Sequence, residues 1–366
     1  MTDTSFLAPT EPIRSRFPGA PHIAGTATAF TARRYAQDEV VEALSEFTDP
    51  KFTRFARTSG VEHRNLALPL HRYPTLTGFT EANTAYLEVA AELGEQAVAR
   101  ALADAHLDPT EVDAIVTVSS TGIAVPTVDA RIAARLGLRP DVKRIPIFGL
   151  GCVAGAAGLA RAHDYLRGYP DHVAVLLSVE LCSLTLQRND TSIPALIGLC
   201  LFGDGAAAVV SAGAQRSPST PEPGPRIVAT RSRLLPDTVD VMGWNVGSTG
   251  FQLVMSREVP AMAQNHLAGE VDEFLAEHGL TAADIATWVC HHGGPKVLDA
   301  IDDAVRPPQN ALRHSWNSMR EHGNISSASV LDVLARTLQT PPPRGSFGVM
   351  LAMGPGFSFE LLLLSW

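Results

Sequence analysis

Cys152 is the residue of this sequence that is best placed to act as a nucleophile. The apolar run 144–148 before it predicts a short strand, and the Ala- and Leu-rich segment after it predicts a helix through His163 and Leu166. A thiol where a strand turns into a helix meets unpaired N–H groups and the positive end of the helix dipole, which favour the thiolate. An isolated cysteine among Gly and Ala is more often a buried structural residue. Two further side chains favour the catalytic interpretation.

His291 and Asn324 could act together with this thiol. His291 follows the predicted strand 285–290, and Asn324 follows a glycine where the predicted helix 325–338 begins. An imidazole can hold the cysteine as a thiolate, and the N–H groups of His and Asn can bind a developing oxyanion. The set suits acyl transfer to sulfur, followed by carbon–carbon bond formation with a carbanion made by loss of CO₂. Phe202, just before a Gly-Asp-Gly turn, would supply an apolar wall where the carboxylate is lost.

An internal repeat predicts that these groups meet. Residues 107–116 resemble 280–289, residues 151–156 resemble 323–328, and residues 202–205 resemble 353–356, always in the same order. Such a pattern indicates a duplicated α/β unit, with sheets covered by helices. Cys152 and Asn324 then occupy equivalent helix N-termini. Because ligands bind beyond the carboxyl ends of strands, His291 would lie beside both.

The same pattern divides the chain. We expect an irregular Pro- and Thr-rich segment at 1–20, an N-terminal half at 21–212 that carries Cys152, and a C-terminal half at 226–366 that carries His291 and Asn324. Between the halves, residues 213–225 are dense in Pro, Gly and Ser and predict a linker.

Composition narrows the class of protein. The chain has 366 residues, is 45% hydrophobic and has a net charge of −9 without a basic run, which argues against a nucleic-acid partner. We find no apolar signal segment and no run long enough to span a bilayer. The four cysteines lack zinc-site spacing and are too few for a disulfide framework in a chain of this length. We therefore expect a reduced, cytoplasmic enzyme without a metal.

Five motifs together resemble the type III polyketide synthases, homodimeric enzymes of the thiolase fold that are related to chalcone synthase. The motifs lie at 149–155, 201–208, 288–295, 323–328 and 354–356. The resemblance implies a five-layered αβαβα core made of two duplicated halves. It also implies an acyltransferase of secondary metabolism that loads an acyl-CoA starter on Cys152, extends it with malonyl-CoA by decarboxylative Claisen condensation, and cyclises the chain. His291 and Asn324 become the decarboxylation and oxyanion partners, Phe202 becomes a gatekeeper, and no cofactor or metal is needed.

The resemblance also implies positions around the substrate. The second gatekeeper falls at Leu253, and Val125 falls where the plant enzymes reach across the dimer interface. Further pocket-lining positions fall at Trp244, Cys182, Thr185 and Ser326. Of the three basic residues that contact CoA phosphates in the family, Lys51 and Arg54 match, whereas the third position holds Thr58 and Arg57 could substitute. Residues 180–185 and 242–244 are similar to bacterial alkylresorcinol and alkylpyrone synthases, which implies a fatty acyl starter and a resorcinol- or pyrone-type product.

Three alternatives remain open from sequence. A priming ketoacyl-ACP synthase shares the Cys-His-Asn set but usually has His-Gln-Ala-Asn around its histidine, whereas this chain has His-His-Gly-Gly-Pro from His291. A non-catalytic subunit of a thiolase-fold heterodimer is disfavoured because Cys152, His291 and Asn324 are all intact. A cysteine hydrolase would need an open water site, and the sequence has no peptide-binding signature.

Overall fold

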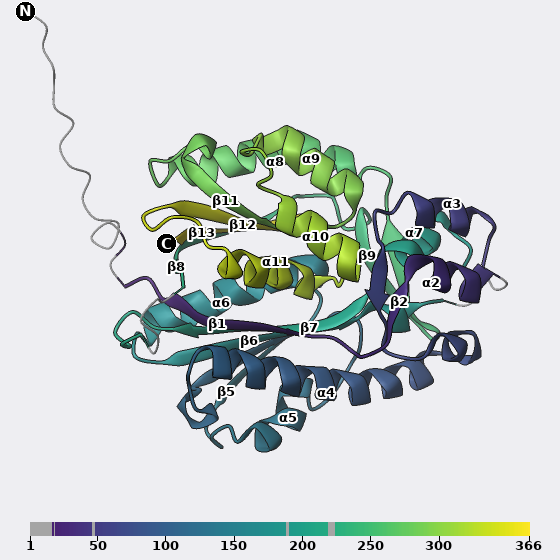
Figure 1. The fold of residues 1–366 in the computed structure, drawn as a ribbon, viewed down its shortest axis with the longest axis horizontal. Coiled ribbons are helices and arrows are strands. Elements are labelled where there is room, and N and C mark those ends of the chain that lie inside the picture. The colour runs from purple at the N-terminus through teal and green to yellow at the C-terminus, as the bar shows by residue number, and fades with distance from the viewer. Residues whose placement is uncertain (1–16, 18, 46–47, 188–189, 219–223) are drawn as a thin grey trace, which may run out of the picture.

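The structure, a computed structural model, describes residues 17, 19–45, 48–187, 190–218 and 224–366. Most of the predicted irregular segment 1–20 and the middle of the predicted linker 213–225 lie outside the described residues. The fold is built from a large mixed sheet that runs through the molecule, with helices on its faces (Figure 1).

Within the described residues, nine strands form this sheet in the order β11-β12-β13-β8-β1-β7-β6-β4-β5. The strands of the N-terminal half are β1 (His22–Ala29), β4 (Ala114–Val118), β5 (Lys143–Ile147), β6 (Val173–Leu181) and β7 (Asp204–Ala212). Those of the C-terminal half are β8 (Arg226–Leu234), β11 (Ile285–Cys290), β12 (Phe347–Gly354) and β13 (Ser358–Ser365). Only one residue pair, His22 with Arg226, joins β1 to β8, so the sheet has two separately paired halves.

The two halves repeat one topology. In the N-terminal half, β4 is parallel to β6, β6 is antiparallel to β7, and β7 is antiparallel to β1. In the C-terminal half, β11 is parallel to β12, β12 is antiparallel to β13, and β13 is antiparallel to β8. The strands therefore correspond in chain order, and the duplication expected from the internal repeat is confirmed.

Helices form three layers around the two half-sheets (Figure 1). One outer layer consists of α4 (Phe79–Asp104) and α5 (Val128–Leu136), and the other of α8 (Val259–Ala276), α9 (Pro295–Val305) and α10 (Arg313–His322). The central layer consists of α6 (Ala154–Gly168) and α11 (Ser327–Gln339), which contact strands of both halves. Gly155 explains how closely these two helices pack, because a Cβ at this position would lie 2.1 Å from the carbonyl oxygen of Ser327. The five-layered core is thus confirmed.

Smaller elements gather at one end of the molecule. These are α2 (Gln37–Leu44), α3 (Lys51–Arg57), α7 (Ile193–Leu201) and two two-stranded antiparallel sheets, β2 (Arg34–Ala36) with β3 (His63–Asn65) and β9 (Met242–Gly247) with β10 (Gly250–Met255). Short 3₁₀ turns lie at η2 (Leu70–Thr75), η3 (Pro109–Glu111), η4 (Gly151–Val153), η5 (Cys182–Thr185) and η6 (Ala282–Asp284). The sequence pattern did not predict α7, α10 or these two small sheets. In α7, Ile193, Ile197 and Leu201 line a cavity rather than one regular core face.

Candidate active site

The structure brings Cys152, His291 and Asn324 to one cavity of about 630 Å³. Cys152 lies in the turn η4 before α6, His291 follows β11, and Asn324 lies between α10 and α11. Cys152 lies before the linker, and His291 and Asn324 lie more than 130 residues later on its other side, yet the duplicated topology brings all three to the same cavity. Five of the six predicted gatekeeper and pocket positions line the same cavity: Phe202, Leu253, Trp244, Cys182 and Ser326.

Cys152 is held in a largely uncharged setting. Its Sγ lies 3.6 Å from the hydroxyl oxygen of Ser326. Burial raises the pKa of the thiol to about 11, the Ser326 hydroxyl lowers it, and the nearby carboxyl of Glu180 raises it further. Burial thus favours the neutral thiol and opposes the effect of the helix N-terminus, which favours the thiolate. An acceptor for the thiol proton is needed when the sulfur attacks.

His291 can be that acceptor. Its backbone N–H continues the ladder between β11 and β12 by donating to the Leu351 carbonyl at 2.8 Å. This hydrogen bond fixes the backbone from which the imidazole extends. Among the described residues, neither buried ring nitrogen of His291 has a hydrogen-bond partner. Burial lowers the pKa of this imidazole to about 4. At neutral pH the ring is uncharged, so one nitrogen can accept a proton and the other can donate a hydrogen bond.

The amide of Asn324 is oriented by its surroundings. Its Oδ1 accepts a hydrogen bond from the backbone N–H of Ser326 at 2.8 Å, and its Nδ2 donates to the Gly293 carbonyl at 3.2 Å. The Nδ2 therefore has one remaining N–H for a ligand. The backbone is equally constrained, because the Asn324 N–H donates to the Leu201 carbonyl at 2.7 Å and the Asn324 carbonyl accepts from Gly203 at 3.0 Å.

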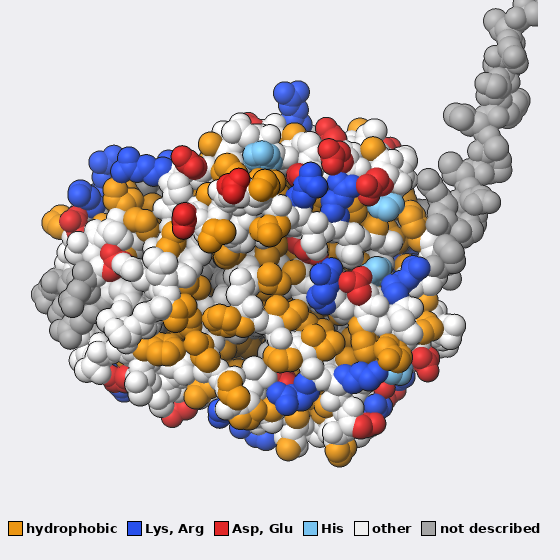
Figure 2. All heavy atoms as spheres, turned by 180° about the vertical axis from the view of Figure 1, so that it is seen from behind, with side chains coloured by type: hydrophobic (Ala, Val, Ile, Leu, Met, Phe, Trp, Pro, Cys, Tyr) orange, Lys and Arg blue, Asp and Glu red, His pale blue; other side chains and the backbone are white. Residues whose placement is uncertain are grey.

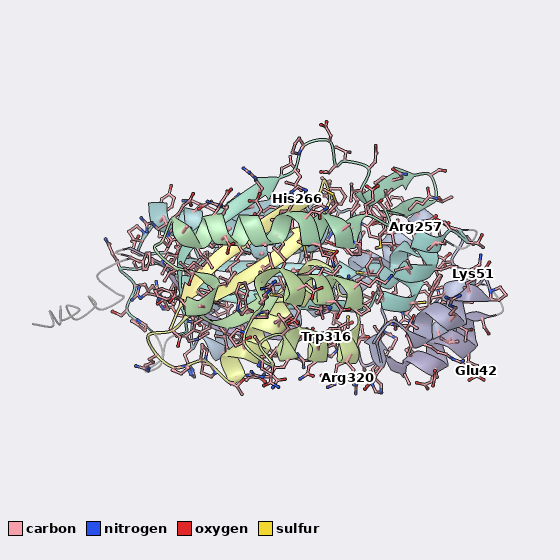
Figure 3. All side chains as sticks on the ribbon, turned by 90° about the horizontal axis from the view of Figure 1, so that it is seen from above. Glu42, Lys51, Arg257, His266, Trp316 and Arg320 are labelled. Atoms are coloured by element: carbon pink, nitrogen blue, oxygen red, sulfur yellow. The ribbon has the colours of Figure 1, made fainter. Side chains whose placement is uncertain are left out.

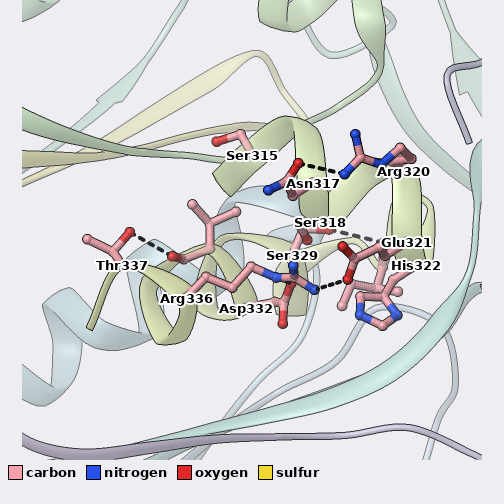
Figure 4. Close-up of polar contacts among 12 residues, drawn as sticks. Ser315, Asn317, Ser318, Arg320, Glu321, His322, Ser329, Asp332, Arg336 and Thr337 are labelled. Carbon is pink, nitrogen blue, oxygen red and sulfur yellow. Dashed lines mark hydrogen bonds and ion pairs between the residues drawn. The ribbon is translucent and has the colours of Figure 1, made fainter. Parts of the chain in front are cut away.

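An ion-pair cluster holds the helices on both sides of Asn324. Arg336 of α11 lies 2.9 Å from a carboxylate oxygen of Glu321 in α10 and 2.7 Å from one of Asp332 (Figure 4). The link between Arg336 and Glu321 spans the turn that contains Asn324. It therefore limits how far α10 and α11 can separate beneath the amide.

Glu180 is a buried carboxyl that the sequence analysis did not single out as a functional residue. It is the second-last residue of β6 and accepts hydrogen bonds from the Ser120 backbone N–H and from four hydroxyl groups, those of Ser120, Thr121, Ser326 and Ser327. Burial raises the pKa of Glu180, and these hydrogen bonds oppose the shift. An acidic residue within a mostly apolar strand is the signal that could have found it, since a buried carboxyl needs donors.

The remaining predicted pocket positions lie at the inner wall and beyond. Thr185 lines a neighbouring cavity of about 50 Å³, which shares Phe202, Trp244 and Leu253 with the main cavity. The rings of Phe202 and Trp244 lie 6.1 Å apart between the two spaces. Val125 lines neither of these two cavities and is 92% exposed.

Cationic side chains surround the mouth of the main cavity. Arg54 lines it from α3 and Thr58 from just after that helix. Arg257 lines it from just before α8, and Lys296 from the start of α9. Lys51 and Arg57 belong to the same helix α3 but do not line the cavity. Lys51 and Arg257 lie at the same end of the molecule (Figure 3). Arg257 and Lys296 were missed from sequence because neither stands in a basic run.

The part of the chain that the structure describes has neither a metal-binding cluster nor a helix suited to cross a membrane. In that part of the chain, no three or more His, Cys, Asp and Glu side chains are grouped so that they could hold a metal ion. None of its helices combines the length and apolar character that crossing a membrane requires.

Known proteins resemble the chain over nearly its full length. Residues 26–215 match the N-terminal domain of the chalcone and stilbene synthases, and residues 226–365 match their C-terminal domain. A 1,3,6,8-tetrahydroxynaphthalene synthase of Streptomyces peucetius subsp. caesius is 49% identical, covering 94% of this chain and 93% of its own. A 3,5-dihydroxyphenylacetyl-CoA synthase of Streptomyces toyocaensis is 32% identical, covering 95% and 91%. The crystal structure of the tetrahydroxynaphthalene synthase of Streptomyces coelicolor A3(2), a bacterial type III polyketide synthase, superposes with a TM-score of 0.87 at 32% identity, covering 94% of this chain and 99% of that one.

Proposed function

The chain belongs to the chalcone and stilbene synthase family of type III polyketide synthases, acyltransferases of secondary metabolism, and we propose that Cys152, His291 and Asn324 carry its reaction. The observation that carries this assignment is the single cavity that unites a thiol, an unpartnered imidazole and an oriented amide from both halves. The proposal needs no cofactor, because the loss of CO₂ itself generates the carbanion.

In the loading step, the sulfur of Cys152 attacks the carbonyl carbon of an acyl-CoA. His291 takes the thiol proton as the C–S bond forms, and returns a proton to the CoA sulfur as that bond breaks. This role suits an imidazole that burial keeps neutral, with a pKa of about 4. The thiol, whose pKa is about 11, needs such a base at neutral pH.

In the extension step, malonyl-CoA loses its carboxylate. The bond from Cα to the carboxyl carbon breaks, CO₂ leaves, and the electron pair stays on the thioester as an enolate. The free N–H of Asn324 and an N–H of His291 would bind the enolate oxygen. The Cα then attacks the acyl carbon on Cys152, and the sulfur leaves as the new carbon–carbon bond forms. Phe202 and Leu253 supply an apolar wall, which favours conversion of a carboxylate into neutral CO₂.

The inner wall would set the length and folding of the product. Trp244 stands between the main cavity and the smaller one, and Cys182, Thr185 and Ser326 line the same region. A bulky Trp at this position limits the space for a long starter. We expect Trp244→Gly to let the enzyme accept a longer acyl chain.

CoA would bind at the cationic mouth. The nucleotide end of CoA carries several negative phosphate charges, and Lys51, Arg54 and Arg57 on α3 present positive charge beside the opening. Arg257 and Lys296, which also line the cavity, add further positive charge. The exposure of these side chains suits a ligand part that stays at the surface.

A second copy of the chain is the proposed partner. Strand β5 is the edge of the sheet, and Phe148 and Leu150 just beyond it are 54% and 37% exposed. Ile123 and Val125, on the loop after the neighbouring parallel strand β4, are 40% and 92% exposed. Apolar side chains gather widely on one face of the molecule (Figure 2). A homodimer would cover such groups, and light scattering of the wild type and of Val125→Glu would test it.

For the product we propose 1,3,6,8-tetrahydroxynaphthalene, because the relative at 49% identity bears that name. Its ten carbons correspond to five malonyl units that each lose CO₂, so malonyl-CoA would be both starter and extender. The similarity to alkylresorcinol synthases predicts a fatty acyl starter instead, and that prediction stays open. Mass spectrometry of products from malonyl-CoA alone, and with fatty acyl-CoA, separates the two. An aromatic product from malonyl-CoA alone supports the proposal, and product only with a fatty acyl-CoA contradicts it.

A further inference from the structure

Arg64 is a buried cation beneath the wall of the active site. It lies in the short strand β3 and is 2% exposed. It lines the smaller cavity beside Phe202 rather than the main cavity, so it does not face the reacting atoms. Burying a guanidinium costs free energy unless strong interactions compensate. The contacts of Arg64 therefore indicate its role.

These contacts are with the backbone around the gatekeeper. The Nη1 of Arg64 donates to the Leu199 carbonyl at 2.6 Å and to the Phe202 carbonyl at 2.9 Å. Both carbonyls belong to the end of α7, where the last turn leaves carbonyl groups unpaired and the helix dipole is negative. The Phe202 N–H donates to the Gly198 carbonyl at 2.8 Å. The backbone of Phe202 is therefore fixed from both sides.

The same side chain packs under Asn324. A Cβ at Gly323 would lie 3.2 Å from both Cγ and Cδ of Arg64, so the aliphatic stem contacts the residue before the amide. Two backbone hydrogen bonds then join Asn324 to Leu201 and Gly203, on either side of Phe202. Arg64 thus touches both segments of a junction that holds the gatekeeper and the oxyanion amide together.

The charge of Arg64 is not used in a direct ion pair with Asp204. The carboxylate of Asp204 accepts instead from the backbone N–H groups of Ala67 and Ser183 and from the Ser183 hydroxyl. Among the described residues, Nε and Nη2 of Arg64 have no hydrogen-bond partner. Burial lowers the pKa of Arg64 to about 10, which leaves the group charged at neutral pH. Its directed interactions are therefore those with the α7 carbonyls.

We propose that Arg64 is a positioning residue for decarboxylation, which fixes Phe202 and Asn324 relative to each other across the cavity. The inference rests on the roles proposed above for these two residues. Cys152 and His291 are held by η4 and β11, which Arg64 does not bond. Loss of the guanidinium therefore impairs decarboxylation while acyl loading continues.

The test compares Arg64→Met, Arg64→Lys and the control Arg33→Met. Arg33 also donates to a backbone carbonyl, that of Ala67 at 3.0 Å, but not to the segment 199–203. Loading of Cys152 is followed by intact-protein mass spectrometry, and decarboxylation by acetyl-CoA release from malonyl-CoA. We expect Arg64→Met to lower kcat for decarboxylation about tenfold or more, with loading within about threefold and KM for malonyl-CoA within about twofold. For Arg64→Lys, whose ammonium can reach one carbonyl, we expect a kcat for decarboxylation between those of Arg64→Met and the wild type. Arg33→Met should have the kcat of the wild type.

The outcomes separate this inference from the function on which it rests. If wild type does not decarboxylate malonyl-CoA, or Asn324→Ala decarboxylates as well as wild type, the proposed function fails. Suppose that wild type and Asn324→Ala behave as proposed. If the rates of loading and decarboxylation then fall equally in the Arg64 variants, or if neither rate falls, Arg64 has no positioning role. If Arg64→Met does not fold, the rates of loading and decarboxylation in Arg64→Lys are compared in the same way.

Discussion

The two halves of the molecule meet at the active site through equivalent turns that are held in different ways. Gly151, before the nucleophile, lies against the C-terminal turn 353–356, where a Cβ would be 2.6 Å from a Pro355 ring carbon. Gly323, before the amide, lies against the N-terminal turn 201–205, where a Cβ would be 2.5 Å from the Leu201 carbonyl oxygen. The first contact is apolar packing, whereas the second includes backbone hydrogen bonds and the buried Arg64.

The duplicated topology explains where the two turns lie, and the differences between the two halves explain which chemical groups the turns carry. The repeated topology brings two helix N-termini to one centre. The residues at those N-termini then differ in chemistry, with a thiol in one half and an amide in the other. We infer that one half carries the acyl group and the other stabilises the enolate, with His291 serving both.

Removing the thiol gives the largest expected effect. Cys152→Ala should abolish acyl loading, by at least about 10⁴-fold, because no other group in the site takes its place as nucleophile. Intact-protein mass spectrometry after incubation with acyl-CoA measures the adduct. Cys182→Ala, which removes another cysteine of the same cavity, should still load. A full adduct on Cys152→Ala would place the nucleophile elsewhere.

Removing the imidazole should change the pH dependence of loading. The pKa of His291, about 4, lies below its ordinary value of 6.5, so the base is already deprotonated at pH 6 and the wild-type rate should be flat from pH 6 to 9. In His291→Ala only the thiolate attacks, and with a pKa near 11 its fraction grows tenfold per pH unit over this range. At pH 7 the loss should be about 10²–10⁴-fold. Rapid-quench loading at several pH values measures this, and a flat profile in the variant would contradict it.

Removing the amide should affect the other step. Asn324→Ala should lower decarboxylation of malonyl-CoA about 100-fold, since one oxyanion donor is lost, and leave loading within about threefold. Asn317→Ala, which removes an amide from α10 that pairs with Arg320, is the matched control. Equal losses in loading and decarboxylation would mean that Asn324 supports the whole site rather than the enolate.

Substituting Gly151 or Gly323 should have the smallest effect of these changes, and it compares the two turns directly. Their φ values are +54° for Gly151 and +68° for Gly323, so a Cβ adds backbone strain to the contacts described above. Gly151→Ala and Gly323→Ala should each lower the free energy of unfolding by about 2–4 kcal/mol. Gly279→Ala, with φ +67° and open space around it, should cost only about 1 kcal/mol. Urea unfolding measures this, and three equal losses would show that the contacts contribute nothing.

Sequence reasoning could predict the fold and the centre of the site because both depend on local patterns. The repeated segments fixed the correspondence of strands, and a Gly before Cys152 and before Asn324 identified the two helix N-termini. The pKa of Cys152 could not be predicted in this way, because it depends on burial in the folded chain, on the hydroxyl of Ser326 and on the carboxyl of Glu180, and both residues are distant or unmarked in the sequence pattern. The role of Arg64 could not be predicted either, since burial under a gatekeeper has no sequence signature.

The most direct test of the division between the halves is decarboxylation of malonyl-CoA by Cys152→Ala. The account predicts that this variant, which carries no acyl group, still releases acetyl-CoA at a rate within about tenfold of wild type, because His291 and Asn324 remain in place. If its rate instead falls as far as that of Asn324→Ala, the thiol and the amide do not serve separate steps, and the central claim is wrong.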